Sequence, residues 1–185
     1  MVGRPSLRFA HEMNGDWYPW SVRSNGGSPE LYVEAYRHVR ALFASAGATN
    51  VRWVWSPNAI SYGEDNALRA SFPGVEHVDV IGVDGYNRGS TDSLSRWQSP
   101  QELFEPTLAT LEVLAPDVPV WINETGCSSV GGDEVQWVSD LFDYLRRTKV
   151  SAVVWFEIGA KDGSDWRVFN DKQTQAAVRA ALEEW

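Results

Sequence analysis

Residues 8–20, RFAHEMNGDWYPW, combine an acid with closely spaced aromatic rings. A short apolar segment leads to His11 and Glu12, and three aromatic residues, including Trp17, follow directly. Aromatic rings stack on the apolar faces of sugar rings, and a carboxyl group can transfer a proton at a glycosidic oxygen. This combination of residue types is therefore suited to cleaving a sugar chain.

Glycoside cleavage normally requires two carboxyl groups, about 5–5.5 Å apart in retaining enzymes and about 6.5–9.5 Å apart in inverting ones. The sequence does not give that separation, but four acids follow apolar runs: Glu12, Asp84, Glu124 and Glu157. Glu12, flanked by HEMNG and WYPW, and Glu124, between an apolar run and a Thr-Gly turn, are favoured. Asp84 is interpreted as a supporting hydrogen-bond acceptor, and Glu157 as either catalytic or structural.

His11 beside Glu12 raises the alternative of a metal site. The zinc motif H-E-x-x-H fails because position 15 is glycine. His38 falls within a predicted helix and His77 at the start of a predicted strand, so no three-histidine cluster is expected. The single cysteine, Cys127, has no clear histidine partner for nucleophilic catalysis and excludes an internal disulfide. We predict neither a metal nor an organic cofactor.

The composition indicates a globular protein with a sizeable core. The chain has 185 residues, of which 43% are apolar, and a net charge of −9, which argues against nucleic acid as a partner. No apolar span is long enough to cross a bilayer, and the first ten residues lack the apolar region of a signal peptide. We predict no membrane association, and the localisation stays open. Ten tryptophans exceed what a core alone explains.

Strands and helices are predicted to alternate along the chain. Apolar runs predict strands over residues 6–10, 50–55, 78–83, 118–123 and 150–156, and helices over 28–46, 99–114, 133–147 and 171–185. Ser99 and Glu102 form a capping box. The first helix is expected to bury its apolar positions 31, 35, 39, 42, 43 and 46.

Such continuously apolar strands indicate a parallel sheet covered by helices, with polar residues gathered at the carboxyl ends of the strands. No nucleotide-binding glycine motif follows a strand. A (β/α)8 barrel and an open doubly wound sheet both place their sites at that edge. The aromatic content favours the barrel.

Five motifs in order, HEMNG with WYPW, VRWVWSPN, VDVIGVDGYN, WINETG and VVWFE, resemble glycoside hydrolase family 26. The resemblance covers nearly the whole chain, and the first and fourth motifs together make it specific. It implies a retaining (β/α)8 enzyme, in most members an endo-β-1,4-mannanase, that acts on β-mannan without a cofactor. It further implies that Glu12 is the general acid/base and Glu124 the nucleophile of a double displacement.

The resemblance also implies residues that bind the sugar chain. His11 would hydrogen-bond the 2-hydroxyl of the sugar that is cleaved, and Tyr86 would orient Glu124. Trp155 would lie beneath that sugar, and Trp17 would support the leaving-group side. The resemblance also implies, less specifically, that Trp53, Asn58 and Asp84 line the site or support its catalytic residues.

The chain departs from the family pattern at its start. Its first predicted strand carries the motif of the family's fourth strand, so three β/α units have no counterpart. We therefore expect a barrel truncated to its last five β/α units, strands 4–8, as one catalytic domain over residues 1–185 without its N-terminal third. Three interpretations stay open: a fragment, a barrel closed by a partner chain, or an open α/β layer. The exposed sheet edges would make self-association an option.

The expected function is hydrolysis of internal β-1,4-mannosidic bonds in mannan, galactomannan or glucomannan. One alternative is an inactive fragment that still binds carbohydrate. Another is a hydrolase of β-1,3-xylan or of mixed-linkage β-1,3-1,4-glucan that uses the same two glutamates. The sequence alone does not distinguish an axial from an equatorial 2-hydroxyl.

Overall fold

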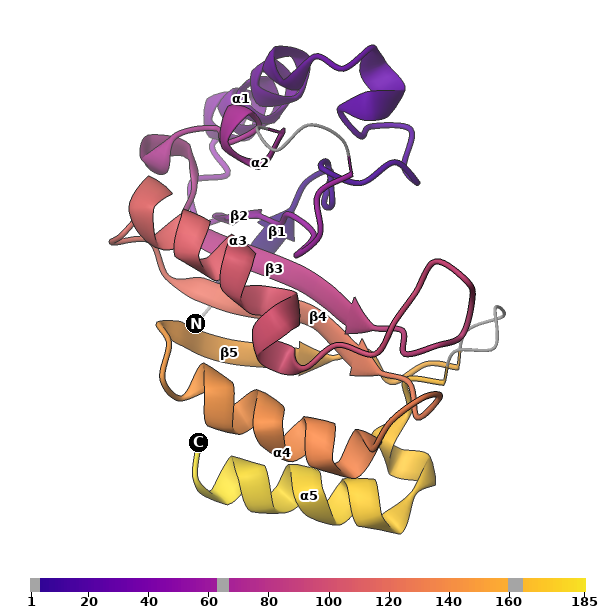
Figure 1. Cartoon of the computed structure of the whole chain (residues 1–185). Helices are drawn as coiled ribbons and strands as arrows, with labels where there is room; N and C mark the ends of the chain where they lie inside the picture. The colour runs from indigo at the N-terminus through magenta and orange to yellow at the C-terminus, as the bar shows by residue number, and fades with distance from the viewer. Residues whose placement is uncertain (1–3, 63–66, 160–164) are drawn as a thin grey trace. The chain divides into compact units, whose positions relative to one another are not determined.

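The computed structural model describes residues 4–62, 67–159 and 165–185 and divides into two compact units. Unit 1 comprises Met1–Asp84 and Ala109–Trp121, and unit 2 comprises Gly85–Leu108 and Ile122–Trp185. Figure 1 shows the elements of both units. Glu12 belongs to unit 1 and Glu124 to unit 2.

The strands form one parallel sheet in the order β1-β2-β3-β4-β5. Their bounds are β1 (Ser6–Arg8), β2 (Arg52–Trp55), β3 (Val80–Asn87), β4 (Val120–Cys127) and β5 (Val150–Trp155). Leu7 of β1 lies opposite Trp53 of β2, and Val54 lies opposite Val80 of β3. The predicted α/β class with parallel strands is confirmed.

Four long helices occupy the predicted positions, and a short one was not predicted. The helices are α1 (Pro29–Ser45), α2 (Ala67–Ala70), α3 (Pro100–Leu114), α4 (Glu134–Leu145) and α5 (Lys172–Glu183). The capping box before α3 is confirmed, because Ser99 N–H donates to Glu102 at 2.8 Å and Glu102 N–H donates to Ser99 Oγ at 3.2 Å. In the described ranges, no helix has the length and apolar character needed to cross a membrane.

Helix α1 of unit 1 buries a different face from the one predicted. Tyr32 and Tyr36 are its buried residues, and the Tyr36 ring packs against Trp53 of β2 at 5.9 Å between centroids. Leu31 and Leu42, which were expected to face inward, are more than half exposed. The two tyrosines bring larger apolar surfaces to the sheet than the leucines do, and burial follows the larger area.

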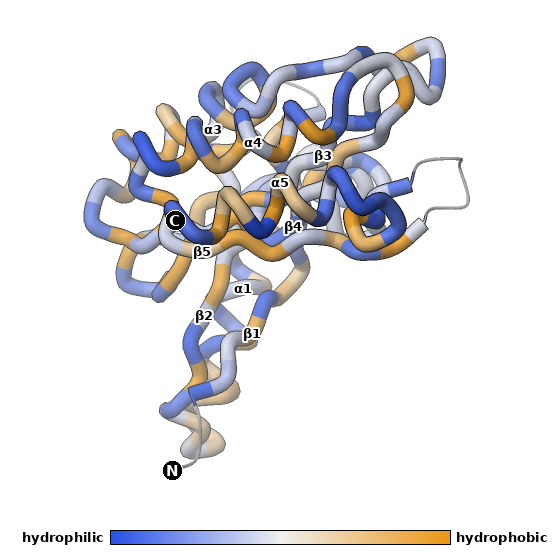
Figure 2. The backbone as a smooth tube through the Cα atoms, turned by 90° about the horizontal axis from the view of Figure 1, so that it is seen from below, coloured by the Kyte–Doolittle hydropathy of each residue, from blue (hydrophilic) through white to orange (hydrophobic). Residues whose placement is uncertain are grey.

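Unit 2 has its core between β5 and the last two helices. Helices α4 and α5 lie side by side (Figure 1), and Val138, Phe142 and Ala181 form a buried cluster between them. Val153 and Trp155 of β5 pack against this cluster. Figure 2 shows β5 as a largely apolar segment, which agrees with its sequence VSAVVW.

The carboxyl-terminal ends of three strands differ from the prediction by two residues or more. β1 ends at Arg8, before the predicted end, because Ala10 has a left-handed backbone (φ 47°) that a strand does not accommodate. β3 and β4 continue beyond their apolar runs to Asn87 and Cys127. The tight turn predicted directly after Glu124 is therefore wrong, and Glu124 lies within β4.

Candidate active site

Glu12 follows β1 in a buried segment with an uncommon backbone conformation. Its φ is 55°, and the residue is only 6% exposed. Its N–H donates to the Ser56 carbonyl at 2.6 Å, and its carbonyl accepts from Gly15 N–H at 3.0 Å. Non-glycine residues in the left-handed region cost about 1–3 kcal/mol and are concentrated at functional sites. The surrounding hydrogen bonds hold Glu12 in this conformation.

Both carboxylate oxygens of Glu12 accept hydrogen bonds from side chains of unit 1. Trp17 Nε1 donates to Oε2 at 2.7 Å, and Asn58 Nδ2 donates to Oε1 at 2.6 Å. The Trp17 residue is 43% exposed, so much of its ring remains open to a ligand. The structure thus brings together three of the predicted site residues, namely Glu12, Trp17 and Asn58.

A second aromatic group surrounds His11. Its Nε2 lies 3.1 Å from the Tyr18 hydroxyl, and its carbonyl accepts from Trp20 Nε1 at 2.8 Å. The rings of Tyr18 and Trp20 are stacked, with centroids 4.4 Å apart. The conformation of His11 is therefore fixed by its neighbours, and its predicted contact with a sugar 2-hydroxyl stays a prediction.

Asp84 lies at the centre of a buried polar group. It has no exposed surface, and each of its carboxylate oxygens lies 3.1 Å from Arg8 Nη1. The Ser56 hydroxyl also donates to this carboxylate, at 3.2 and 3.3 Å. The ion pair and the hydrogen bonds offset the free-energy cost of burying this charged carboxylate. These contacts agree with the prediction that Asp84 is a supporting hydrogen-bond acceptor. They do not favour direct contact between Asp84 and a ligand.

In unit 2, Glu124 is partly buried within β4 and is hydrogen-bonded by Tyr86. The Tyr86 hydroxyl donates to Glu124 Oε2 at 2.6 Å. The Tyr86 ring is flanked by Phe156 at 5.8 Å and by Trp166 at 5.0 Å between centroids. This geometry fits the predicted orientation of Glu124 by Tyr86.

Trp155 occupies a position other than the predicted one. Its ring meets Trp137 of α4 at 6.1 Å and packs against the core cluster of α4 and α5. Its Nε1 donates to the Trp166 carbonyl at 2.5 Å. These contacts place it on the helix side of β5, so the prediction that it lies beneath a bound sugar finds no support. Successive residues of a strand point to opposite faces, which agrees with Phe156 meeting Tyr86.

The surroundings of two further candidates, Glu157 and Cys127, argue against a catalytic role. The Glu157 carboxylate accepts from the N–H groups of Val168 and Phe169, both at 3.0 Å, which favours the structural alternative. Cys127 is fully buried, and this burial raises the pKa of its thiol well above the usual range. A buried neutral thiol is a poor nucleophile. Among the described residues, no group of three or more histidine, cysteine or acidic side chains is arranged to hold a metal ion.

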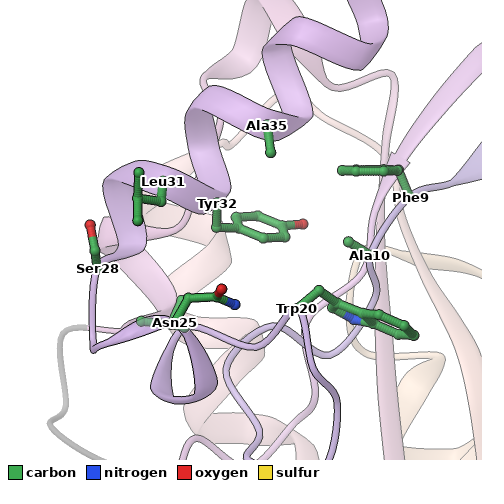
Figure 3. A pocket seen from close by; sticks show the side chains of 9 residues that line it. Phe9, Ala10, Trp20, Asn25, Ser28, Leu31, Tyr32 and Ala35 are labelled. Carbon is green, nitrogen blue, oxygen red and sulfur yellow. The ribbon is translucent and has the colours of Figure 1, made fainter.

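A cavity of about 190 Å³ lies beside the aromatic group of unit 1. Figure 3 shows Leu31, Tyr32 and Ala35 of α1 on one side of it and Phe9, Ala10 and Trp20 on the other. Its remaining lining residues are Val22, Asn25 and Ser28. Its lining includes no carboxylate and no histidine, so it lacks the pair of carboxyl groups that glycoside cleavage requires.

Three residues of these surroundings were missed from the sequence. Arg8 pairs with Asp84. A charged residue inside an apolar strand requires a partner, and this could have identified Arg8 from the sequence. Tyr62 meets the Trp17 ring edge-on at 5.2 Å and follows a segment without a recognised motif. Trp166 flanks Tyr86, and its only signal was a tryptophan within a polar segment.

Comparison with known proteins identifies relatives of this chain. The model of glycosyl hydrolase family 26 matches residues 6–127, a range that includes both glutamates. Endoglucanase H of Acetivibrio thermocellus is 35% identical over 181 residues, which are 95% of this chain and 20% of that protein. A mannan endo-1,4-beta-mannosidase of Bacillus subtilis is 33% identical over 86 residues, which are 43% of this chain and 22% of that protein.

Solved structures share the fold. The catalytic domain of the family 26 endo-beta-1,4-mannanase from Bacillus sp. JAMB-750 gives a TM-score of 0.70 at 21% identity, over 95% of this chain and 49% of that one. The Bacteroides ovatus family 26 beta-mannanase gives a TM-score of 0.68 at 22% identity, with the same coverage. The chain thus spans about half the length of these barrel enzymes and a fifth of the curated relatives.

The family match covers most of the chain, and the fold agrees with it over nearly the whole chain. The resemblance inferred from the motifs is thereby confirmed. The chain belongs to glycosyl hydrolase family 26.

Proposed function

We propose that this chain carries the catalytic glutamates of a β-mannan hydrolase, with Glu12 as general acid/base and Glu124 as nucleophile. One observation carries the proposal: the buried Glu12 carboxylate accepts hydrogen bonds on both oxygens, from Trp17 and Asn58, within the segment that matches the family. A carboxyl group held this firmly, beside a partly exposed indole ring, is equipped to transfer a proton next to a stacked sugar.

The proposed reaction has two steps. In the first, protonated Glu12 gives its proton to the glycosidic oxygen while the Glu124 carboxylate attacks the anomeric carbon, so the glycosidic bond breaks and a glycosyl ester forms. In the second, the Glu12 carboxylate takes a proton from water, whose oxygen attacks the anomeric carbon and releases Glu124.

The neighbouring residues are assigned supporting roles in this proposal. The Tyr86 hydroxyl orients Glu124 through its 2.6 Å hydrogen bond. The exposed part of Trp17 stacks on the sugar that leaves, and His11 contacts the 2-hydroxyl of the sugar that is attacked. Arg8 and Asp84 hold the segment beneath Glu12. The substrate is a polysaccharide, and mannan, galactomannan and glucomannan are the candidates.

A β-glucan is the second candidate substrate, and one comparison favours it. The relative that matches 95% of this chain, at 35% identity, is named an endoglucanase, whereas the mannosidase of Bacillus subtilis matches 43%. Mannosyl and glucosyl units differ in the orientation of the 2-hydroxyl. A site that hydrogen-bonds one orientation discriminates strongly against the other, because its polar groups would be left unpaired.

The test is reducing-end release by the chain from galactomannan and from mixed-linkage β-glucan, assayed side by side. We expect release from galactomannan and its loss in Glu124→Ala, whereas Glu183→Ala, on the exposed face of α5, retains activity. Release from β-glucan alone would favour the second substrate. Binding of mannan without release would favour the inactive carbohydrate-binding alternative, and release undiminished in Glu124→Ala would contradict the proposed nucleophile.

A further inference from the structure

Asn14 forms a clamp on the backbone of Asn58. Its Nδ2 donates to the Asn58 carbonyl at 2.8 Å, and its Oδ1 accepts from the Asn58 N–H at 2.8 Å. The Asn14 side chain thus binds both backbone groups of Asn58 and leaves the Asn58 side chain untouched. Asn14 is 1% exposed, so little water competes for these hydrogen bonds.

The clamp is anchored at further points. Asn14 Nδ2 also donates to Ser61 Oγ at 3.0 Å, and the Asn14 carbonyl accepts from Tyr62 N–H at 2.8 Å. Asn14 therefore ties the HEMNG segment to the segment that follows β2 at residues 58, 61 and 62. Both segments belong to unit 1.

The orientation of the Asn58 amide follows from its own partners. Its Oδ1 accepts from Ile60 N–H at 2.8 Å, so its Nδ2 is the atom directed at Glu12 Oε1, at 2.6 Å. An amide that has its oxygen engaged by a backbone N–H cannot flip without losing that bond. Asn58 therefore presents a donor to the carboxylate.

We infer that Asn14 is a positioning residue, which by clamping the backbone of Asn58 aims the Asn58 amide at the Glu12 carboxylate. This inference goes beyond a structural role for the turn, because it predicts that Asn14 affects Glu12 only through Asn58. It rests on the proposed function for its catalytic meaning, and its geometric content is measurable without substrate.

The indole N–H of Trp17 provides the measurement, because it donates to the other oxygen of Glu12. In a ¹H–¹⁵N spectrum, the resonance missing in Trp17→Phe is assigned to Trp17 among the ten tryptophans. We expect this resonance to titrate with the Glu12 carboxyl and to become independent of pH in Glu12→Gln. Its titration midpoint then reports how well the ionised carboxylate is stabilised.

A double-mutant cycle tests the inference. Asn58→Ala removes the donor but keeps the backbone clamp, so we expect it to fold and to raise the midpoint, since the charged form loses a hydrogen bond. Asn14→Ala should raise the midpoint in the same direction by a smaller or equal amount. Asn14→Ala should add no further shift in the Asn58→Ala background.

The matched control is Asn87→Ala in unit 2. Asn87 is equally buried and bonds Cys127, Gly89 and Gln98, so its loss should lower stability without moving the Trp17 resonance. If Asn14→Ala does not fold, Ser61→Ala weakens the clamp more mildly and replaces it in the cycle. The inference would be overturned if the midpoint shifts of the two variants were additive, or if the titration midpoint of the Trp17 resonance did not move in Asn58→Ala. If the midpoints shift as expected but the chain hydrolyses no polysaccharide, only the proposed function is refuted.

Discussion

The two glutamates are each followed by a glycine and accompanied by a tryptophan, but the two arrangements differ. In unit 1, a Cβ on Gly15 would lie 2.5–2.7 Å from the Trp17 ring, and in unit 2 a Cβ on Gly126 would lie 3.0–3.2 Å from Trp166. Both glycines therefore leave space for an indole. Trp17 is 43% exposed and bonds Glu12 directly, whereas Trp166 is 4% exposed and packs on Tyr86.

This difference shows two ways of positioning a carboxylate. The ring beside Glu12 is partly exposed, as the role proposed for Trp17 on the leaving-group side requires. The ring in unit 2 is buried and packs on Tyr86, whose hydroxyl donates a hydrogen bond to Glu124. We infer that the unit 1 tryptophan serves binding and proton transfer, and that the unit 2 tryptophan serves rigidity.

The largest expected effect separates the two glutamates. Glu124→Ala should lower activity at least about 10⁴-fold on every substrate, because the covalent step is lost. Glu12→Ala should cost about 10²–10⁴-fold on polysaccharide but much less on an aryl glycoside, whose phenolate leaves without a proton. Steady-state kinetics on both substrates gives the comparison. Equal losses for Glu12→Ala on the two substrates would remove its assignment as the acid.

The glycines are expected to separate stability from activity. Gly126→Ala presses on a buried ring, and overpacking of this kind costs about 1–3 kcal/mol of unfolding free energy. Gly15→Ala should cost less stability, because the exposed Trp17 ring can move away, but should lower kcat through loss of its hydrogen bond to Glu12. Urea unfolding and kinetics of both variants test this contrast, and a reversed order would contradict the assigned roles.

A smaller effect concerns Glu134, in the first turn of α4 in unit 2. Burial, followed by the charges of Asp165, Asp171 and Glu157, raises its pKa from 4.5 to about 7. The folded state thus holds a proton that the unfolded state releases, so stability falls as the pH rises from 4.5 to 7. With solvent screening, the loss is about 1 kcal/mol.

Thermal unfolding at pH 5 and pH 8 measures this effect. Glu134→Gln should reduce the difference in Tm between the two pH values, whereas Glu183→Gln, on the exposed face of α5, should leave it unchanged. A difference that is unaltered in Glu134→Gln would show that the carboxyl is already ionised in the folded state at pH 5.

The sequence predicted those features that depend on local pattern. The order of strands and helices and the capping box at Ser99 all follow from periodicity and side-chain chemistry, and the structure bears them out. The identification of the family from HEMNG and WINETG was likewise confirmed. The grouping of Glu12 with Trp17 was expected from their short separation in the sequence.

Features that depend on packing were beyond the sequence pattern. The apolar stripe of α1 predicted the wrong buried face, because Tyr32 and Tyr36 compete with the leucines for the sheet. Trp155 was placed beneath the sugar, although alternation along β5 turns it toward α4. Arg8 and Trp166 act through contacts distant in sequence, with Asp84 and Tyr86, and no local motif marks such pairs.

The most direct test of the account is covalent labelling of the nucleophile. A 2-deoxy-2-fluoro glycosyl fluoride of the preferred sugar slows both steps of the reaction, because the fluorine destabilises the oxocarbenium-like transition state, while the good leaving group lets the first step proceed. Mass spectrometry of the digested chain should then find one sugar on the peptide that contains Glu124, and none in Glu124→Ala. A label on another residue, or none at all while the chain hydrolyses polysaccharide, would contradict the assignment of Glu124 as nucleophile.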